Sequence, residues 1–382
     1  MNNHSTLMVG SGMSPFLAAI ALTTESQPDQ IPSSAGPLQV ERLASLEFPW
    51  GMAYLPDGRL LITEKPGRLR VWQDGTLGTI AGVPKVAYRG QGGLLDVAVD
   101  PSFDSNGFVY LYFTEAAPNQ RRNPRDPWDP RLGPRPRNPD ATLKGGAIAR
   151  GRLVGSRLQN VRVIWRQTPK TIGRGHYGGS LAFGPDGKLW VTSGERQRFA
   201  PAQSRSGNLG RVVRMNRDGS NAVNWTLGNR NPLGIAVDPG TGKVWIHEMG
   251  PLGGDELNLI ERGRNYGWPI VSEGVHYNRA PIPPHATRPE FARPRLVWNP
   301  VISPAGMFFY RGGMFPKWRG NALIGGLSSQ AIIRVSFNNG IPKEEERLAM
   351  YRRIRDVIEA PDGSLLALTD ARQGGLLRLS TR

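Results

Sequence analysis

Short stretches in which apolar and polar residues alternate recur along the chain, and many of them follow a turn that contains proline. Lys-Leu-Trp-Val-Thr at 188–192 is one example, and it comes directly after Pro-Asp-Gly. An alternation of period two is typical of a half-buried β-strand. Pro-Asp-Gly favours a turn because proline presets φ, aspartate bonds the neighbouring backbone and glycine accepts a positive φ. The pattern therefore predicts strands joined by tight turns.

A single unit, made of an apolar residue, a turn with proline and an alternating strand, is repeated along the chain. It occurs at 54–63, 99–114, 183–192, 237–246, 314–326 and 360–369, and second strands follow at 67–72, 145–153, 210–216, 255–263, 330–337 and 374–380. Six such pairs predict an all-β fold with minimal helix, namely a six-bladed β-propeller of four-stranded antiparallel blades. Two β-sandwiches are the alternative, but they would not require the same turn six times.

The two ends of the chain and one interruption set the expected domain organisation. A strand-like stretch at 38–46 should pair into the last blade, because an open ring would leave an exposed sheet edge. Residues 1–37 form a separable segment, either a degenerate secretion signal or a disordered tail, since the first Lys or Arg is Arg42 and a signal usually begins with positive charge. Residues 38–382 form the propeller, and a Pro- and Arg-rich loop at about 116–144 is inserted in the second blade.

Composition and charge narrow the classes of function. The chain has 382 residues with 48 glycines, 33 prolines and no cysteine, so disulfides and a cysteine nucleophile are excluded. Its net charge is +17, from 48 Lys and Arg against 31 Asp and Glu. This charge is spread along the chain, so no specific nucleic-acid partner is expected. No segment is long and apolar enough to span a bilayer.

Polar residues stand in the loops that precede the predicted first strands, where a propeller commonly binds its ligands. Gln91 and His176 both lie among glycines, and a histidine there suits general-base chemistry, although it could instead bond the backbone. Arg353 and Arg355 would point to the same side of an extended chain and could clamp carboxylates, or they could form a solvated basic face.

The stretch at 228–269 combines groups that could hold an anion and a hard cation. It contains Arg230-Asn231, the corner Met249-Gly250-Pro251 and the pair Asp255-Glu256, and it closes with Tyr266 and Trp268. Guanidinium and amide groups bind anions, while carbonyl and carboxylate oxygens are ligands for calcium. Plain turns and a solvated acidic loop remain the alternative at this point.

At these residues the chain resembles a known family, the soluble pyrroloquinoline quinone (PQQ)-dependent aldose sugar dehydrogenases. The matching segments are GQGGLLDVAVDPSF, GHYGGSLAFGPDGKLWVTSGE, GNRNPLGIAVDP, GPLGGDELNLIERGRNYGWP, GMFFYRGGMFP and RIRDVIEAPDGSLLALTD. They cover most of residues 45–380 in the right order, and the family fold is also a six-bladed propeller. The resemblance implies oxidation of aldose sugars at C1 to lactones, with hydride passing to Ca²⁺-bound PQQ and then electrons to an external acceptor.

The resemblance also assigns expected roles to individual residues. His176 corresponds to the general base, Arg230 to the residue that polarises the quinone oxygen, and Asn231 and Gln91 to contacts with cofactor or sugar. The remaining assignments are to cofactor carboxylates and calcium. Arg353 and Arg355 would hold PQQ carboxylates, the carbonyls of Gly250 and Pro251 would bind the calcium beside PQQ, and Glu256 and the Tyr266 backbone oxygen would bind a second calcium.

Three positions depart from the family pattern. Gly175 stands where glucose-oxidising members have an aspartate that orients the histidine, Met249 where Gln or His is usual, and Ser329 where a cofactor-binding lysine is found. These differences favour subfamily divergence over loss of function. The family also implies a periplasmic or secreted protein and permits a homodimer.

Two other classes of function remain open. One is a cofactor-free propeller that acts as a binding or scaffold module, with the loop at 116–144 as a docking element. The other is a metal-dependent lactonase, which would need a set of carboxylate and amide ligands centred on the channel, and the sequence does not supply one.

Overall fold

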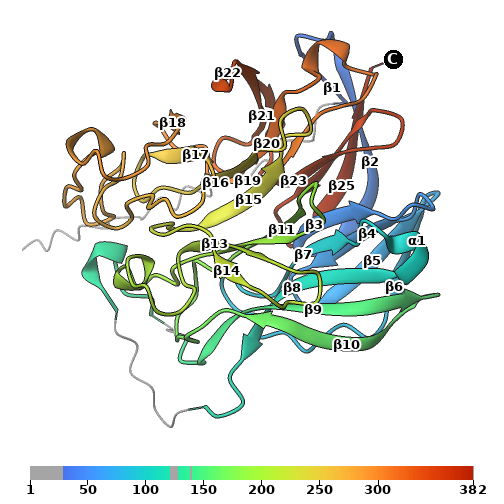
Figure 1. Ribbon diagram of the computed structural model, residues 1–382. Coiled ribbons are helices and arrows are strands. Elements are labelled where there is room, and N and C mark those ends of the chain that lie inside the picture. Colours follow the sequence, from blue (N-terminus) through green and yellow to red (C-terminus); the bar gives the residue numbers. More distant parts are fainter. Residues whose placement is uncertain (1–28, 121–127, 138–139, 382) are drawn as a thin grey trace, which may run out of the picture.

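The protein is a six-bladed β-propeller, as the repeat predicted. The computed structural model describes residues 29–120, 128–137 and 140–381. Six antiparallel sheets surround a central channel, and the first strand of each blade lies innermost against its neighbours (Figure 1). The strand β23 (Ile354–Glu359) of the last blade contacts β3 (Pro49–Tyr54) of the first blade, so the ring is closed.

The first three blades contain four strands each. Blade 1 comprises β3, β4 (Leu60–Glu64), β5 (Arg68–Gln73) and β6 (Thr76–Ile80). Blade 2 comprises β7 (Leu94–Val99), β8 (Phe108–Ala116), β9 (Lys144–Val154) and β10 (Arg157–Arg166). Blade 3 comprises β11 (Gly178–Phe183), β12 (Leu189–Ser193), β13 (Arg211–Met215) and β14 (Val223–Asn224).

The last three blades complete the ring. Blade 4 comprises β15 (Pro232–Val237), β16 (Val244–Glu248), β17 (Asp255–Leu259) and β18 (Leu296–Trp298). Blade 5 comprises β19 (Pro304–Phe309), β20 (Ala322–Gly326), β21 (Ala331–Asn338) and β22 (Ile341–Ala349). Blade 6 comprises β23, β24 (Leu365–Thr369), β25 (Gly374–Ser380), β2 (Leu38–Leu46) and β1 (Gln30–Ile31).

Helix is minimal in the described residues, as expected. It consists of the single turn α1 (Phe103–Asn106) and the 3-10 turns η1 (Pro130–Leu132), η2 (Ala200–Ala202), η3 (His285–Thr287) and η4 (Pro316–Trp318). None of these helices is long and apolar enough to cross a membrane.

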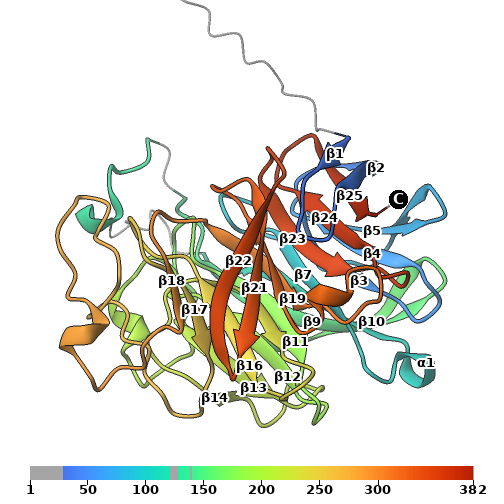
Figure 2. The same cartoon turned by 90° about the horizontal axis from the view of Figure 1, so that it is seen from above.

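Strand β2 closes the ring by joining the last blade, as its position had suggested. It pairs antiparallel with β25, from Gln39 opposite Ser380 to Leu46 opposite Gly374. Figures 1 and 2 show the blue strand beside the red one. The fold also includes residues that precede Leu38, because β1 pairs with β2 and Ser34 accepts a hydrogen bond from Trp318. Residues 1–28 lie outside the described part of the chain.

The Pro-Asp-Gly turns adopt the conformation that their chemistry favours. The glycines of the three turns have φ values of 86° at Gly58, 69° at Gly187 and 83° at Gly363. In each turn the aspartate side chain accepts a hydrogen bond from a backbone N–H two residues on, at 3.0–3.1 Å. These turns therefore have the conformation that their local sequence favours.

Partly buried carboxylates tie neighbouring blades together along the channel. Asp96 on β7 accepts a hydrogen bond from the Leu181 N–H of blade 3 at 2.7 Å, and Asp356 on β23 accepts one from the Met52 N–H of blade 1 at 3.0 Å. Both aspartates line a channel cavity of about 150 Å³. Burial raises the pKa of Asp96 to about 7. These hydrogen bonds link the inner strands of neighbouring blades.

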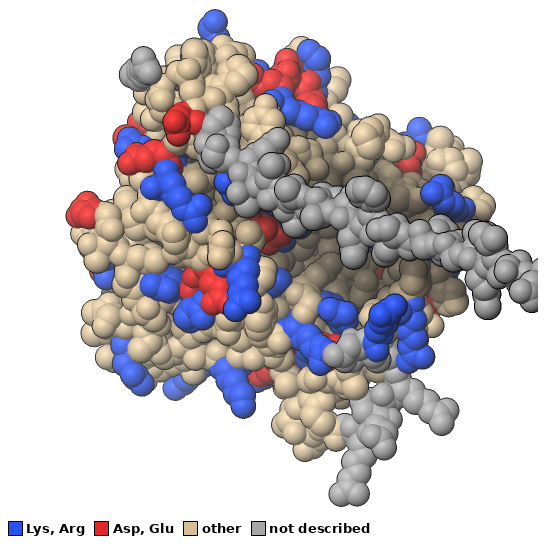
Figure 3. All heavy atoms as spheres, turned by 180° about the vertical axis from the view of Figure 1, so that it is seen from behind, with Lys and Arg blue, Asp and Glu red and all other residues tan. Residues whose placement is uncertain are grey.

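The net positive charge is dispersed on the face shown in Figure 3. Lys and Arg side chains form small groups there, with Asp and Glu among several of them, and some basic groups gather beside a hollow. This face carries no single continuous basic surface. The absence of a nucleic-acid partner remains a prediction.

Candidate active site

Residues from several blades meet at one end of the channel because of strand direction. In an antiparallel blade, the start of the innermost strand and the end of the second strand lie at the same edge. Gln91, His176, Asn231 and Arg353 come just before the inner strands β7, β11, β15 and β23. Glu195, Met249 and Asp370 come just after the second strands β12, β16 and β24, and Lys65 follows β4.

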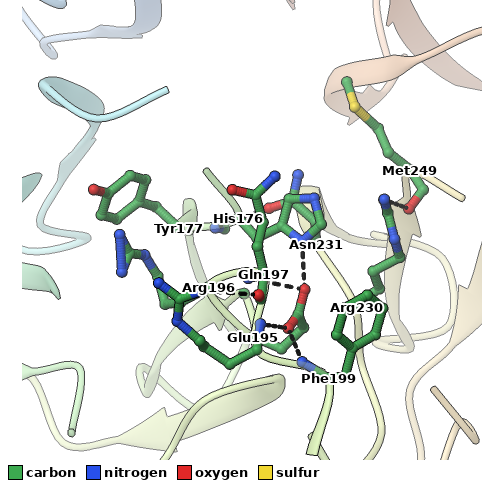
Figure 4. A network of polar contacts seen from close by, with 12 residues as sticks. His176, Tyr177, Glu195, Arg196, Gln197, Phe199, Arg230, Asn231 and Met249 are labelled. Atoms are coloured by element: carbon green, nitrogen blue, oxygen red, sulfur yellow. Dashed lines mark hydrogen bonds and ion pairs between the residues drawn. The ribbon is translucent and has the colours of Figure 1, made fainter. Parts of the chain in front are cut away.

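His176 is held in place by Glu195, which projects from the end of β12 (Figure 4). The imidazole Nδ1 and the Glu195 Oε1 form a short hydrogen bond, and both side chains are buried. The Glu195 carboxylate also accepts hydrogen bonds from the N–H groups of Gln197 and Phe199, at 3.0 and 2.7 Å. His176 itself has a positive φ of 52°, a strained conformation that persists only where surrounding contacts enforce it.

The surroundings keep the imidazole neutral. Burial, and then the positive charge of Arg230, lower the pKa of His176 from 6.5 to about 4, against the opposing effect of Glu195. Burial alone would raise the pKa of Glu195, but the contact with His176 and the Phe199 N–H hold it below its ordinary value. An ionised Glu195 binds the Nδ1–H tautomer of His176, so the lone pair of Nε2 is available as a base.

Gln91 and Gly175 shape the loop that carries His176. The Gln91 side chain accepts a hydrogen bond from the His176 N–H at 2.7 Å, and its backbone N–H donates to the Arg174 carbonyl at 2.8 Å. A Cβ on Gly175 would lie 2.9 Å from the Gln197 side chain. A larger residue at 175 would therefore require the Gln197 side chain to move. Glu195 supplies a carboxylate to His176, which the glycine at 175 does not.

Arg230 and Asn231 lie beside His176 in the same network (Figure 4). The Arg230 guanidinium donates a hydrogen bond to the Met249 carbonyl at 2.7 Å. The backbone N–H of Arg230 donates to the Glu248 carboxylate at 2.6 Å. Asn231 accepts a hydrogen bond from the Gly178 N–H at 3.2 Å. Within the described part of the chain, Arg230 Nε and Asn231 Nδ2 are buried without a hydrogen-bond partner. Both atoms are donors that a bound acceptor could satisfy.

Arg353 and Arg355 do share one side of the chain, as their spacing predicted. Both pair with Asp370, at 2.8 Å for Arg353 and 3.1 Å for Arg355. Arg355 lies over the Trp50 ring at 4.0 Å, and the Lys65 ammonium lies 5.6 Å from the same ring. Burial, and then the charge of Arg355, lower the pKa of Lys65 to about 8. Two arginines therefore pair with one carboxylate, and a lysine lies near the same ring as Arg355, so the cations here outnumber the carboxylate and would attract a further anion.

Three of the four residues expected at calcium, Gly250, Glu256 and Tyr266, line a small cavity. Its volume is about 20 Å³, and Glu248 also lines it. The Tyr266 carbonyl lies 3.1 Å from His285 Nε2. Among the described residues, no three His, Asp or Glu side chains are grouped to hold a metal, so a cation here would also need backbone oxygens.

The remaining expected positions lie nearby. Gly250 donates its N–H to Asp255 at 2.8 Å, and Pro251 is buried beside it. Met249 contributes its carbonyl to Arg230. Ser329 stands in the turn between β20 and β21, with its hydroxyl 3.5 Å from the Ile302 carbonyl.

Sequence reasoning did not single out Glu195, Asp370 or Lys65. It considered mainly the loops before the first strands, whereas these residues follow second strands. The repeat did contain the missing signal. Charged residues directly after the second strand of a blade lie at the same rim as those before the first strand.

A known protein family matches the chain over most of its length. The profile of the family described as Glucose / Sorbosone dehydrogenase matches residues 46–378. The chain belongs to this family.

Individual relatives and solved structures are similar to the chain over most of its length. The chain is 34% identical to aldose sugar dehydrogenase YliI of Escherichia coli, over 88% of this chain and 91% of that protein. A crystal structure of a glucose dehydrogenase superposes with a TM-score of 0.81 at 38% identity, covering 90% of this chain and all of that one. The PQQ-bound aldose sugar dehydrogenase of Streptomyces coelicolor superposes with a TM-score of 0.68 at 25% identity, covering 93% and 99%.

Proposed function

We propose that this protein oxidises aldose sugars at C1 to lactones, with PQQ and Ca²⁺ as cofactors and His176 as the general base. The observation that carries the proposal is the neutral imidazole of His176, oriented by Glu195 and placed beside Arg230. The membership of the chain in a sugar dehydrogenase family and its similarity to a PQQ-bound enzyme support the choice of cofactor.

The residues present fit the proposed cofactor. PQQ carries three carboxylates, and Lys65, Arg353 and Arg355 supply three cations against the single carboxylate of Asp370. The unpartnered donors Arg230 Nε and Asn231 Nδ2 suit carbonyl and carboxylate oxygens. The oxygen-rich corner at Gly250 and Pro251 has the donor chemistry that calcium requires, and Glu256 with the Tyr266 carbonyl could hold a second calcium.

The chain's own groups account for proton transfer and charge stabilisation. His176 Nε2 would take the proton of the sugar C1 hydroxyl, while Glu195 stabilises the imidazolium that forms. When bound, PQQ would accept the hydride from C1, which leaves the carbonyl of a lactone. Arg230 would stabilise negative charge on the acceptor oxygen, because its guanidinium is already fixed by the Met249 carbonyl.

The proposal predicts dye reduction by the purified protein reconstituted with PQQ and Ca²⁺, across a panel of aldoses. Activity should disappear on chelation and return with calcium. His176→Ala should abolish turnover but leave PQQ binding, measured by absorbance titration, largely intact, because the imidazole takes a proton and does not hold a carboxylate.

The results of these experiments distinguish the proposed enzyme from the alternatives. If turnover survives in His176→Ala, the assignment of the base is wrong. If the wild-type protein fails to bind PQQ, the cofactor-free binding or scaffold module becomes the better account. The external electron acceptor, the periplasmic or secreted location and a homodimer remain predictions from the resemblance.

A further inference from the structure

Part of the blade 2 insertion forms a capped, hydrogen-bonded turn in spite of its proline content. Asp129 caps η1 by accepting a hydrogen bond from the Arg131 N–H at 2.9 Å, and it also pairs with the Arg131 guanidinium at 2.6 Å. Trp128 donates its ring N–H to the Gly133 carbonyl at 3.1 Å. We call residues 129–133 the insertion turn.

The insertion turn packs against loops of two other blades. The Arg131 carbonyl accepts a hydrogen bond from the Tyr277 N–H at 3.1 Å, in the long loop between β17 and β18. The Arg131 guanidinium lies over the Phe199 ring at 4.1 Å, and Leu132 packs against the cluster that contains Phe199 and Trp268. The turn is therefore part of the packed structure around the candidate active site.

Through these contacts the insertion turn is connected to Arg230 and to the pair of Glu195 and His176. Phe199 stacks on Trp268 with ring centroids 5.6 Å apart, and the Arg230 guanidinium lies 5.1 Å from Trp268 on this stack. Phe199 also donates its N–H to Glu195, the partner of His176. Arg131 and Arg230 thus contact the two members of one aromatic pair.

Tyr277 occupies the exposed edge of this arrangement. Its hydroxyl lies 3.3 Å from the Arg230 guanidinium, while its backbone is held by the insertion turn. The residue is nevertheless 44% exposed. An aromatic ring that is fixed at both ends and open to solvent beside the catalytic arginine is suited to stack on the C–H face of a pyranose ring.

We propose that the insertion turn and Tyr277 form one wall of the sugar site, with Tyr277 as the stacking surface and Arg131 as a positioning residue. The proposal rests on the proposed sugar oxidation. It gives the Pro- and Arg-rich insertion a role in substrate binding within its own chain, in place of docking to another protein.

The test compares steady-state kinetics of variants reconstituted with PQQ and Ca²⁺. Tyr277→Ala should raise KM by about tenfold with a smaller change in kcat, because a stacking surface is lost. Tyr277→Phe keeps the ring and should stay within about threefold of wild type. Arg131→Ala should raise KM in the same direction, and Arg135→Ala, an exposed arginine of the same insertion, should leave KM unchanged.

A double-mutant cycle tests whether the two residues act together. The Arg131 side chain holds the insertion turn through Asp129 and the Phe199 ring, and the backbone of that turn binds the Tyr277 N–H. Because Arg131 would affect sugar binding only by positioning Tyr277 in this way, the effects of Arg131→Ala and Tyr277→Ala on KM should not add. An unchanged KM in Tyr277→Ala, or fully additive effects, would overturn the proposed wall while the sugar oxidation stands. A wild-type protein that binds PQQ but oxidises no aldose would instead overturn the proposed function and the wall with it. Unfolding temperatures of all variants should match wild type.

Discussion

The chemistry of His176 depends on contacts that its neighbours in sequence do not provide. Glu195 lies nineteen residues away and binds its Nδ1, Gln91 binds its backbone, and Arg230 contributes to the lowered pKa. Burial is the largest cause of that low pKa, and an exposed histidine would titrate near 6.5. The same residue type in a solvated glycine loop would be protonated over much of the acidic range.

We predict that this environment extends activity to low pH. A general base must be neutral, and kcat/KM reports the ionisation of the free enzyme. With a pKa of about 4 for His176, kcat/KM should stay level as pH falls from 7 to about 5 and should decline as pH falls through about 4. The measurement is dye reduction by the reconstituted enzyme across this range.

An inflection of the wild-type profile near pH 6.5 would show that the imidazole is solvated and would contradict the burial of His176. Glu195→Gln provides a second readout, because it removes the carboxylate that fixes the tautomer. This variant should lower kcat by about a hundredfold. Glu290→Gln, an exposed carboxylate far from His176 in sequence, is its matched control.

At the scale of elements, strand β2 closes the ring of blades, a role that its sequence alone only suggests. Its buried residues Leu38 and Val40 belong to the cluster that also contains Leu377 and Leu379 of β25. The two strands come from opposite ends of the described chain and pair along their length. Ring closure is therefore an interaction between sequence-distant strands, and it covers an edge that would otherwise be exposed.

Leu38→Ala should destabilise the protein by about 2–5 kcal/mol, because it leaves a cavity in the core where β2 meets β25. The measurement is the free energy of unfolding from urea titration. Glu41→Ala, an exposed position on the same strand, serves as the control and should have little effect. Equal stability of Leu38→Ala and wild type would mean that β2 does not contribute to the cooperative fold.

Within the insertion, contacts with other blades order a segment whose own sequence does not predict order. Its composition suggested an unstructured loop, but the described turn at 129–133 is capped, ion-paired and packed on Phe199. Apolar periodicity is absent there, so pattern alone could not reveal the packing. Contacts from blades 3 and 4 supply the order instead.

At the scale of the whole molecule, cofactor sites and stability should be linked. A ligand that binds only the folded state stabilises it by mass action. We predict that a chelator lowers the unfolding temperature and that Ca²⁺ restores it, since the carboxylates and carbonyls near Glu256 would hold the ion only in the assembled blade. Differential scanning calorimetry measures this shift.

Glu256→Gln keeps the shape of the side chain but removes a candidate ligand, so it should reduce the calcium-dependent shift. Glu261→Gln, an exposed carboxylate nearby in sequence, should retain it. If neither the chelator nor calcium changes the unfolding temperature, a stabilising calcium site in this protein is excluded.

Much of the architecture follows from the sequence by itself. Period-two alternation specifies strands and Pro-Asp-Gly specifies turns, as the glycine conformations at Gly58, Gly187 and Gly363 confirm. These are short-range effects, because each depends on residues only a few positions apart. Repetition of one unit six times then determines the propeller, the rim that carries His176 and Arg230, and the shared side of Arg353 and Arg355.

Only the tertiary structure decided which side chains meet. It paired His176 with Glu195, placed Asp370 between two arginines, and set the insertion turn against Phe199 and Tyr277. Partners of this kind come from different strands and blades, so no local sequence pattern predicts that they will be in contact. Their geometry arises when the closed ring brings the strand ends to one rim, where burial then sets the charge of each group.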